Sequence, residues 1–216
     1  MKKILLTGFG PFGDDNINPA LEVIKELDKQ IIKLSDKSNT NIEYIIETIE
    51  LPVVFGKAIN VFEEAVQQVQ PELIISIGQA GGRAGISLEK VGININDARI
   101  ADNDGNKPEG ELIYPHGPAA YFTTIDMEFT LKKLKEAMIP VEISYSASTY
   151  VCNNLIYGAM HFLTHSQEYS HVKYGFIHIP YIPLQVISKN KIFPTLPLET
   201  IKKAIMVIVE TNLLDK

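Results

Sequence analysis

The chain has 216 residues, of which 45% are hydrophobic, and its formal net charge is -6. A chain of this size can bury roughly 70% of the surface that it exposes when unfolded, so we expect residues 1–216 to form a single domain. The acidic balance lacks the basic excess that binding to nucleic acid or an anionic membrane requires, and neither partner is expected. No apolar run reaches membrane-spanning length. One cysteine cannot form an internal disulfide, which favours a reducing, cytoplasmic location.

Strand-like and helix-like segments alternate along the chain. Short continuous apolar runs indicate buried strands, and apolar residues at helical spacing indicate amphipathic helices. Strands are expected at residues 3–7, 42–51, 73–77, 86–95, 141–145 and 174–180. Helices are expected at residues 20–32, 54–69, 124–138 and 198–213, and from residue 152 onward. This alternation predicts an α/β fold with a twisted, mainly parallel (mixed) central sheet and helices on both faces.

Glycine-rich turns and one long loop separate these segments. The turn at residues 8–13 does not have the glycine spacing of a dinucleotide-binding fingerprint, so a phosphate site is not expected there. Asn18 and the proline after it supply a helix cap and a first-turn proline. A second glycine-rich turn covers residues 78–83, and residues 35–41 are a polar connector. Residues 101–119 are rich in Gly, Pro, Asp and Asn and are expected to form a loop, either a lid or a subunit contact.

The single cysteine, Cys152, lies between a predicted strand and a predicted helix. The unpaired amides and the positive end of a helix stabilise a thiolate, so this position predicts a thiol pKa below the usual value of roughly 8.5. Buried free cysteines, however, usually act as small hydrophobic residues. Cys152 is therefore either a nucleophile or an inert core thiol.

A cysteine nucleophile needs a base, a group that orients the base, and donors for the developing oxyanion. His178 is the best candidate base, because it lies near the end of a predicted strand, just before Pro180, and ligands of open α/β sheets gather at the carboxyl ends of strands. In its predicted strand, Glu89 falls on the same alternating positions as the apolar residues, so its side chain is expected to face the interior. A buried carboxylate needs a group that binds it. Glu89 either orients His178 or forms a salt bridge with Arg83 or Arg99. Arg99 itself is either a surface ion-pair partner or an oxyanion donor.

Two further pairs of residues have alternative interpretations. His161 and His165 are one helical turn apart, but a zinc site needs more ligands and no third one is apparent, so no metal is expected. Phe9 and Phe12 are either core residues or walls of a ligand pocket, and a loop is an unusual place for two core aromatics.

Four separated stretches of the chain match one pattern. They are Gly8-Phe-Gly-Pro-Phe-Gly with Asn18-Pro19, Gly78-Gln-Ala-Gly-Gly-Arg through Glu89 to Asn96-Asp-Ala-Arg, Tyr150-Val-Cys-Asn, and Gly175-Phe-Ile-His-Ile-Pro. Together they resemble the pyroglutamyl peptidase I (pyrrolidone carboxyl peptidase) family of cysteine peptidases over nearly the whole chain. The resemblance implies hydrolysis of an amino-terminal pyroglutamyl residue from peptides through a thioester. It also implies that no metal or organic cofactor takes part and that the protein is a homotetramer.

The resemblance assigns a role to each candidate residue. Cys152 would be the nucleophile, His178 its general base, and Glu89 the carboxylate that orients the imidazole. The implied substrate-binding residues are Phe9, Phe12, Gln79, Arg99 and Val151, with Arg99 next to the oxyanion site.

The chain departs from the family pattern just before its cysteine. Ser148 stands where glycine is common, and Tyr145 stands where a smaller polar residue is common; either change could narrow the pocket entrance. If Ser148 has a positive φ, the loop is strained by on the order of 1 kcal/mol. These departures leave one alternative function, a non-catalytic protein that binds a lactam. A redox sensor based on Cys152 is disfavoured, because the chain has no resolving cysteine.

Overall fold

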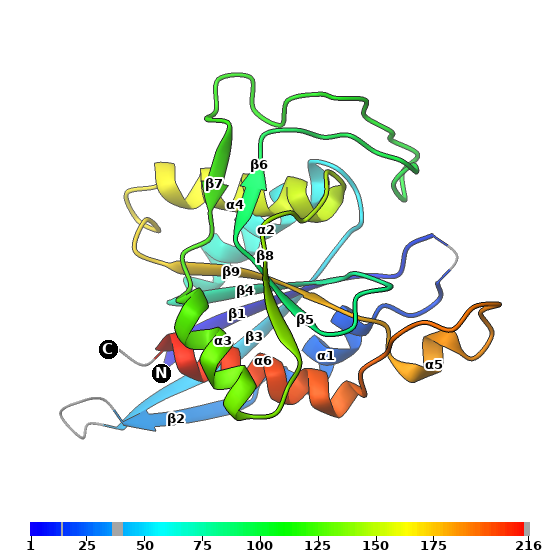
Figure 1. The fold of residues 1–216 in the computed structure, drawn as a ribbon. Coiled ribbons are helices and arrows are strands. Elements are labelled where there is room, and N and C mark those ends of the chain that lie inside the picture. The colour runs from blue at the N-terminus through cyan, green and yellow to red at the C-terminus, as the bar shows by residue number, and fades with distance from the viewer. Residues whose placement is uncertain (14, 36–40, 214–216) are drawn as a thin grey trace.

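The computed structural model of the chain describes residues 1–13, 15–35 and 41–213. Its centre is a seven-stranded sheet with the strand order β2-β3-β1-β4-β9-β5-β8 (Figure 1). These strands are β1 (Lys2–Phe9), β2 (Ile31–Ser35), β3 (Asn41–Leu51), β4 (Leu73–Gln79), β5 (Ile86–Glu89), β8 (Val141–Ser144) and β9 (Lys173–Ile179). A separate two-stranded ribbon pairs β6 (Val91–Ile93) with β7 (Ala120–Phe122).

The central sheet is mixed and mainly parallel, as the sequence predicts. β1 is parallel to β3 and to β4, β4 is parallel to β9, and β5 is parallel to β8. The antiparallel pairs are β2 with β3 and β5 with β9. Because β3, β1, β4 and β9 run in the same direction, their carboxyl ends meet at one edge of the sheet.

Helices cover both faces of the sheet (Figure 1). One face packs against α1 (Pro19–Leu27), α3 (Met127–Glu136) and α6 (Leu198–Leu213). The other packs against α2 (Lys57–Val69) and α4 (Val151–His165). Alternate residues of β1 enter the two cores: Ile4 and Leu6 face the first, and Leu5 and Phe9 face the second. A short helix, α5 (Pro183–Val186), follows β9.

Several predicted boundaries were wrong. The helix predicted at 20–32 ends at Leu27, because Lys29 adopts a φ of 60° and the two β-branched residues that follow begin β2. The helices predicted from residues 54 and 124 begin at 57 and 127. Three short elements, β2, β7 and α5, were not predicted from the sequence. Of the predicted connector at 35–41, residues 36–40 lie outside the described ranges.

The strand predicted at 86–95 is two strands. It breaks at Lys90, so that β5 joins the central sheet and β6 joins the ribbon that packs on α4. The loop predicted at 101–119 is confirmed as a stretch without helix or regular strand. No helix within the described residues is long and apolar enough to span a membrane.

Candidate active site

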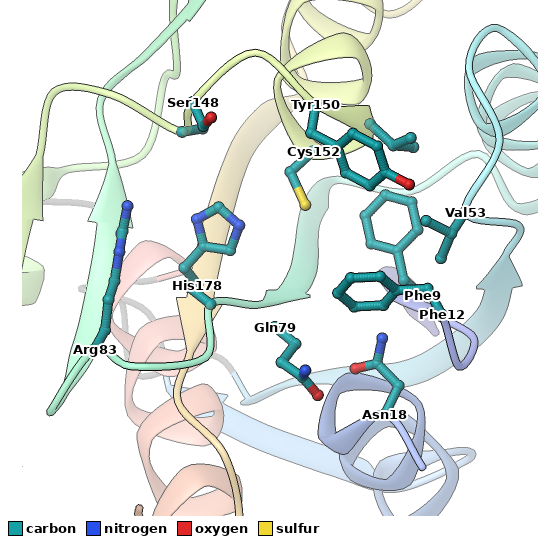
Figure 2. Close-up of a pocket in the computed structure, with 13 residues that line it drawn as sticks. Phe9, Phe12, Asn18, Val53, Gln79, Arg83, Ser148, Tyr150, Cys152 and His178 are labelled. Carbon is teal, nitrogen blue, oxygen red and sulfur yellow. The ribbon is translucent and has the colours of Figure 1, made fainter. Parts of the chain in front are cut away.

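A pocket of about 200 Å³ lies at the carboxyl edge of the parallel strands, on the side that α4 covers (Figure 2). Its walls come from segments that are far apart in the sequence. The lining residues are Phe9, Phe12, Asn18, Val53, Gln79, Ala80, Arg83, Ala147, Ser148, Tyr150, Val151, Cys152 and His178. Cys152 and His178, predicted from separate segments, therefore line one cavity.

Strand register brings Cys152 and His178 together. Gly78 of β4 is the parallel partner of His178 in β9. A Cβ atom added to Gly78 would lie 3.1 Å from Cys152 Sγ, so this glycine leaves room for the sulfur to approach the strand beside the histidine. Figure 2 shows the sulfur pointing into the space between the His178 ring and the two phenylalanines of the opposite wall.

Glu89 reaches the same histidine through the antiparallel pairing of β5 with β9. Ser87 lies directly opposite His178, and Glu89, two residues further along β5, is on the same face as a diagonal neighbour. The distance from His178 Nδ1 to Glu89 Oε1 is 2.7 Å. Arg83 Nη1 also donates to Glu89 Oε1, at 2.6 Å. Glu89 thus contacts both His178 and Arg83, the partners that the sequence had offered as alternatives.

The surroundings set the protonation of Glu89 and His178. Burial raises the pKa of Glu89, but the interactions with His178, followed by those with Ser144 and Arg83, together outweigh burial and hold that pKa below its usual value. Glu89 is therefore ionised and accepts from His178, which places the imidazole proton on Nδ1. Burial lowers the pKa of His178 more than Glu89 raises it, so the ring is neutral near pH 7 and Nε2 is free to accept a proton.

The predicted pKa of Cys152 was wrong in direction. Burial, followed by the nearby Glu89 charge, raises the thiol pKa to about 12, although Arg83 acts in the opposite direction. The half-buried Cys152 lies against Gly78 at the pocket, and desolvation there outweighs the effect predicted from its position at a helix start. At rest the site therefore holds a neutral thiol beside a neutral imidazole.

The first turn of α4 presents backbone amides near the sulfur. Tyr150 is the N-cap residue, and within the described part of the chain no side chain caps this helix start. The first intrahelical hydrogen bond runs from Asn154 N to Tyr150 O, at 3.1 Å. The amides that precede it, including that of Cys152, have no partner within the helix. They are available to stabilise a negatively charged oxygen.

Two asparagines hold this helix start in place. Asn153 Oδ1 accepts from Ile93 N at 2.9 Å, and Asn153 Nδ2 donates to Ile93 O and Ile95 O, both at 2.9 Å. Asn154 Oδ1 accepts from Gly56 N at 3.1 Å. The start of α4 is thus attached both to the β6 segment and to the turn before α2.

The wall opposite His178 is aromatic. Phe9 is 2% exposed and its ring centroid lies 6.5 Å from that of Phe176, while the same side chain lines the pocket. Phe9 is therefore both a core residue and a pocket wall, which the sequence had presented as alternatives. The ring centroid of Phe12 lies 6.4 Å from that of Tyr150, which packs edge-on against Phe55 at 5.3 Å.

Gln79 and Val151 also line the pocket, and the amide of Gln79 is held on both sides. Gln79 Nε2 donates to Asp15 Oδ2 at 3.2 Å, and Gln79 Oε1 accepts from Gln185 Nε2 at 2.7 Å. Lys189 Nζ contacts the other oxygen of Asp15 at 2.6 Å. These contacts attach the end of β4 to the region around α5.

The loop at residues 101–106 is attached to three walls of the pocket. Asn103 N donates to Val53 O at 3.1 Å, and Asn103 Nδ2 donates to Pro11 O at 3.0 Å. Tyr150 Oη donates to Ala101 O at 3.0 Å. Asp102 is 6% exposed and accepts from the backbone of Phe55 at 2.9 Å. This part of the predicted loop links the pocket walls to one another.

The structure does not place every predicted residue in the pocket. Arg99 is exposed and absent from the lining, and Arg83 is the arginine beside Glu89. Tyr145 is 71% exposed and is also outside the lining. Ser148 does line the pocket, and its φ of 64° meets the condition under which strain was expected in this loop. Among the described residues, no group of three or more His, Cys, Asp and Glu is arranged to hold a metal ion; His161 Nδ1 instead lies 3.0 Å from Tyr121 Oη.

Six lining residues had not been assigned to the site from the sequence: Asn18, Val53, Ala80, Arg83, Ala147 and Tyr150. Asn18 was assigned only a capping role, and Arg83 only a possible salt bridge. Tyr150 lies in a matched stretch next to the cysteine, and Val53 lies just beyond the end of a predicted strand; that proximity was the available signal.

Comparison with known proteins gives one consistent result. Residues 2–214 match the family model described as pyroglutamyl peptidase. The chain is 46% identical over 213 residues to a pyrrolidone-carboxylate peptidase of Bacillus cereus (strain ATCC 10987 / NRS 248), covering 99% of this chain and 94% of that relative. It is 47% identical over 212 residues to the protein of the same name from Bacillus thuringiensis (strain Al Hakam), covering 98% and 93%.

Solved structures agree with these sequence matches. The crystal structure of pyroglutamyl peptidase I from Bacillus amyloliquefaciens matches with a TM-score of 0.89 and 42% identity, covering 99% of this chain and 96% of that one. A variant of the pyrrolidone carboxyl peptidase from the hyperthermophile Pyrococcus furiosus matches with a TM-score of 0.88 and 39% identity, covering 98% of each chain.

Proposed function

This chain belongs to the pyroglutamyl peptidase family, and we propose that its Cys152, His178 and Glu89 carry out the reaction. The protein is a cysteine peptidase that removes a pyroglutamyl residue from the amino terminus of peptides. The observation that supports these roles is the 2.7 Å hydrogen bond between Glu89 Oε1 and His178 Nδ1, next to the pocket that contains the Cys152 sulfur. The alternative of a lactam-binding protein without activity is not favoured.

In the proposed first step, His178 activates the thiol. Nε2 of the neutral ring takes the proton of Cys152 while Sγ attacks the scissile carbonyl carbon, which joins the pyroglutamyl residue to the next amine. The imidazolium that forms is stabilised by the ionised Glu89, which accepts from Nδ1. His178 then gives its proton to the leaving amine, and a thioester to Cys152 remains. Water, deprotonated by the same ring, hydrolyses the thioester.

The developing oxyanion needs donors that point at it before the reaction begins. We assign this role to the uncapped backbone amides at the start of α4, including that of Cys152. Arg99, the other candidate, is exposed and outside the pocket lining, so we do not assign the role to it. Removing one donor of this kind typically costs a factor of about 100 to 1,000 in kcat.

The pyroglutamyl ring is flat, uncharged and mostly apolar, and the pocket suits those properties. Phe9, Phe12 and Val151 offer apolar surface for its faces, and polar groups at Gln79 and Asn18 border the same cavity. We infer that the ring binds between the phenylalanines with its scissile carbonyl at Cys152. Because a lactam has no ammonium group, a pocket that offers no opposite charge to the ring can discriminate against ordinary amino termini.

We further propose that residues 1–216 act as one catalytic domain, in a cytoplasmic homotetramer. Exposed apolar side chains on the segment that carries β6 and β7 support assembly: Ile93, Ile100, Leu112 and Phe122. The single cysteine supports a reducing compartment. Sedimentation equilibrium tests the assembly, and a mass of one or two chains at micromolar concentration would contradict it.

The experiment for the function compares purified reduced parent protein with Cys152→Ala. Release of a fluorescent amine from a pyroglutamyl amide should occur with the parent and fall by a factor of about 1,000 or more in the variant. The matched substrate is the prolyl amide, which has the same ring without its carbonyl and carries a charge; its hydrolysis should be negligible. If Cys152→Ala released the amine at the parent rate, Cys152 would not be the nucleophile. Thermal stabilisation by pyroglutamate without turnover would instead support the lactam-binding alternative.

A further inference from the structure

Arg83 contacts both parts of the proposed catalytic machinery. It ends the glycine-rich turn between β4 and β5, and its side chain is 29% exposed. Nη1 lies 2.6 Å from Glu89 Oε1, and Nη2 donates to Ser146 O at 3.2 Å. Glu89 orients the base, and Ser146 belongs to the loop that leads to Cys152. One guanidinium thus joins the segment of the base-orienting carboxylate to the segment of the nucleophile.

The two donors to Glu89 converge on a single oxygen atom. Oε1 accepts from both His178 Nδ1 and Arg83 Nη1, and the Glu89 side chain is fully buried. A buried carboxylate without a cationic partner is costly, so Arg83 lowers the cost of burying the Glu89 charge, which the hydrogen bond from His178 also stabilises. A guanidinium also has a rigid planar geometry, which restrains where its partner oxygen can lie. The position of that oxygen, in turn, sets the orientation of the His178 ring.

We propose that Arg83 is a positioning residue for the peptidase reaction, which holds the Glu89 carboxylate and the loop before Cys152 in the arrangement that His178 needs. This proposal rests on the function proposed above for Cys152, His178 and Glu89. Arg83 lines the pocket, and Figure 2 shows it on the far side of His178 from the sulfur, so it acts through its neighbours rather than on the scissile bond.

Electrostatics gives this role a measurable signature. The charged groups acting on His178 are Glu89 from β5 and Arg83 from the turn, while α4 adds the neutral Cys152 thiol and β4 faces the ring with Gly78. Arg83 opposes protonation of the ring. Removing its charge therefore raises the pKa of His178. Since the neutral ring is the active base, the acid limb of kcat/KM must then move to higher pH.

An arginine that only stabilised the fold would behave differently. Its loss would lower the melting temperature and the fraction of folded enzyme, but the remaining enzyme would keep the parental pH profile. Lys202 of α6 provides the matched control, because it also contacts two carboxylates, Glu26 at 2.5 Å and Glu199 at 2.8 Å, and its side chain is 22% exposed. It lies on a helix that covers the opposite face of the sheet.

The test measures kcat, KM and the pH profile for a pyroglutamyl amide in Arg83→Gln, Arg83→Lys and Lys202→Gln. We expect Arg83→Gln to lose about 10- to 100-fold in kcat with KM within about twofold, and its acid limb to move up by about half a pH unit or more. Arg83→Lys keeps the charge but cannot bridge Glu89 and Ser146 O, so we expect a parental acid limb of kcat/KM and a smaller loss of kcat. Lys202→Gln should match the parent in both quantities.

The outcomes separate this inference from the proposed function. If Arg83→Gln kept the parental kcat and the parental acid limb of kcat/KM while Cys152→Ala was inactive, only the role of Arg83 would be overturned. An active Cys152→Ala would overturn the proposed function itself. If Arg83→Gln does not fold, Arg83→Lys decides: a reduced kcat at unchanged KM supports positioning, and a parental kcat overturns it.

Discussion

Two helices begin at the wall of the pocket, and their starts are built differently. At α1, Asn18 Oδ1 accepts from Ala20 N at 3.0 Å, and Asn18 Nδ2 donates to Gly10 O at 2.8 Å. At α4, the N-cap residue is Tyr150, and no side chain of the described residues caps the first turn. A missing cap usually costs about 1 kcal/mol of stability. α1 therefore gains stability from its start, whereas α4 leaves its amides free beside Cys152.

The largest test of this comparison concerns the thiol at the α4 start. Burial raises the pKa of Cys152 to about 12, so the thiolate fraction should grow about tenfold for each pH unit up to that value. We expect the alkylation rate with iodoacetamide to rise about 100-fold between pH 7 and pH 9. Cys152→Ser, which has no thiol, serves as the blank. A plateau below pH 8 would show that the helix start and His178, rather than burial, govern the thiol.

The second prediction adds a cap where α4 has none. In Tyr150→Ser, the hydroxyl can accept from the first-turn amides, so the helix should become more stable while those amides become less available to the oxyanion. Tyr150→Ala loses the same aromatic ring without adding a cap, and both variants lose the contacts with Phe12 and Phe55. We expect kcat of Tyr150→Ser to be about tenfold lower than that of Tyr150→Ala, measured with a pyroglutamyl amide. Equal kcat values would remove the amides from the mechanism.

The third prediction removes the cap that α1 has. Asn18→Ala should lower the free energy of unfolding by about 1–2 kcal/mol, because it loses the cap and the bond to Gly10 O. Denaturant titration measures this change. Asn18→Asp keeps a capping oxygen but lacks the amide donor, so its loss should be smaller. If the two variants lost equal stability, the cap itself would contribute nothing.

The smallest prediction concerns the loop just before the α4 start. Ser148 has a φ of 64°, a conformation that glycine adopts without strain. Ser148→Gly should therefore raise the stability by up to about 1 kcal/mol, less the backbone entropy that glycine loses on folding. Ser148→Ala keeps the strain and should not be stabilised. Thermal unfolding of both variants provides the measurement, and a stabilised alanine variant would contradict the argument from φ.

Sequence patterns predicted the elements better than their boundaries. The buried strands and the helices at 151–165 and 198–213 follow from apolar spacing, which depends only on neighbours along the chain. The break at Lys90 did not follow, because β6 leaves the sheet to pack on α4, a contact between distant segments. At Gly92 a Cβ atom would lie 2.7 Å from the Ile156 side chain, so close packing requires glycine there. No local pattern reveals such a contact.

The sequence by itself determined the α/β class and the order of Glu89, Cys152 and His178. It also identified the residue at risk of strain, Ser148. Only the tertiary structure decided how these residues meet. Pairing of β5 with β9 places Glu89 diagonal to His178, and the absence of a side chain at Gly78 leaves room for the Cys152 sulfur. The tertiary structure also decided that Arg83 rather than Arg99 forms the ion pair with Glu89 and that burial raises the pKa of Cys152. The physical reason is that register and desolvation depend on segments that are remote in the chain, whereas propensity and spacing are local.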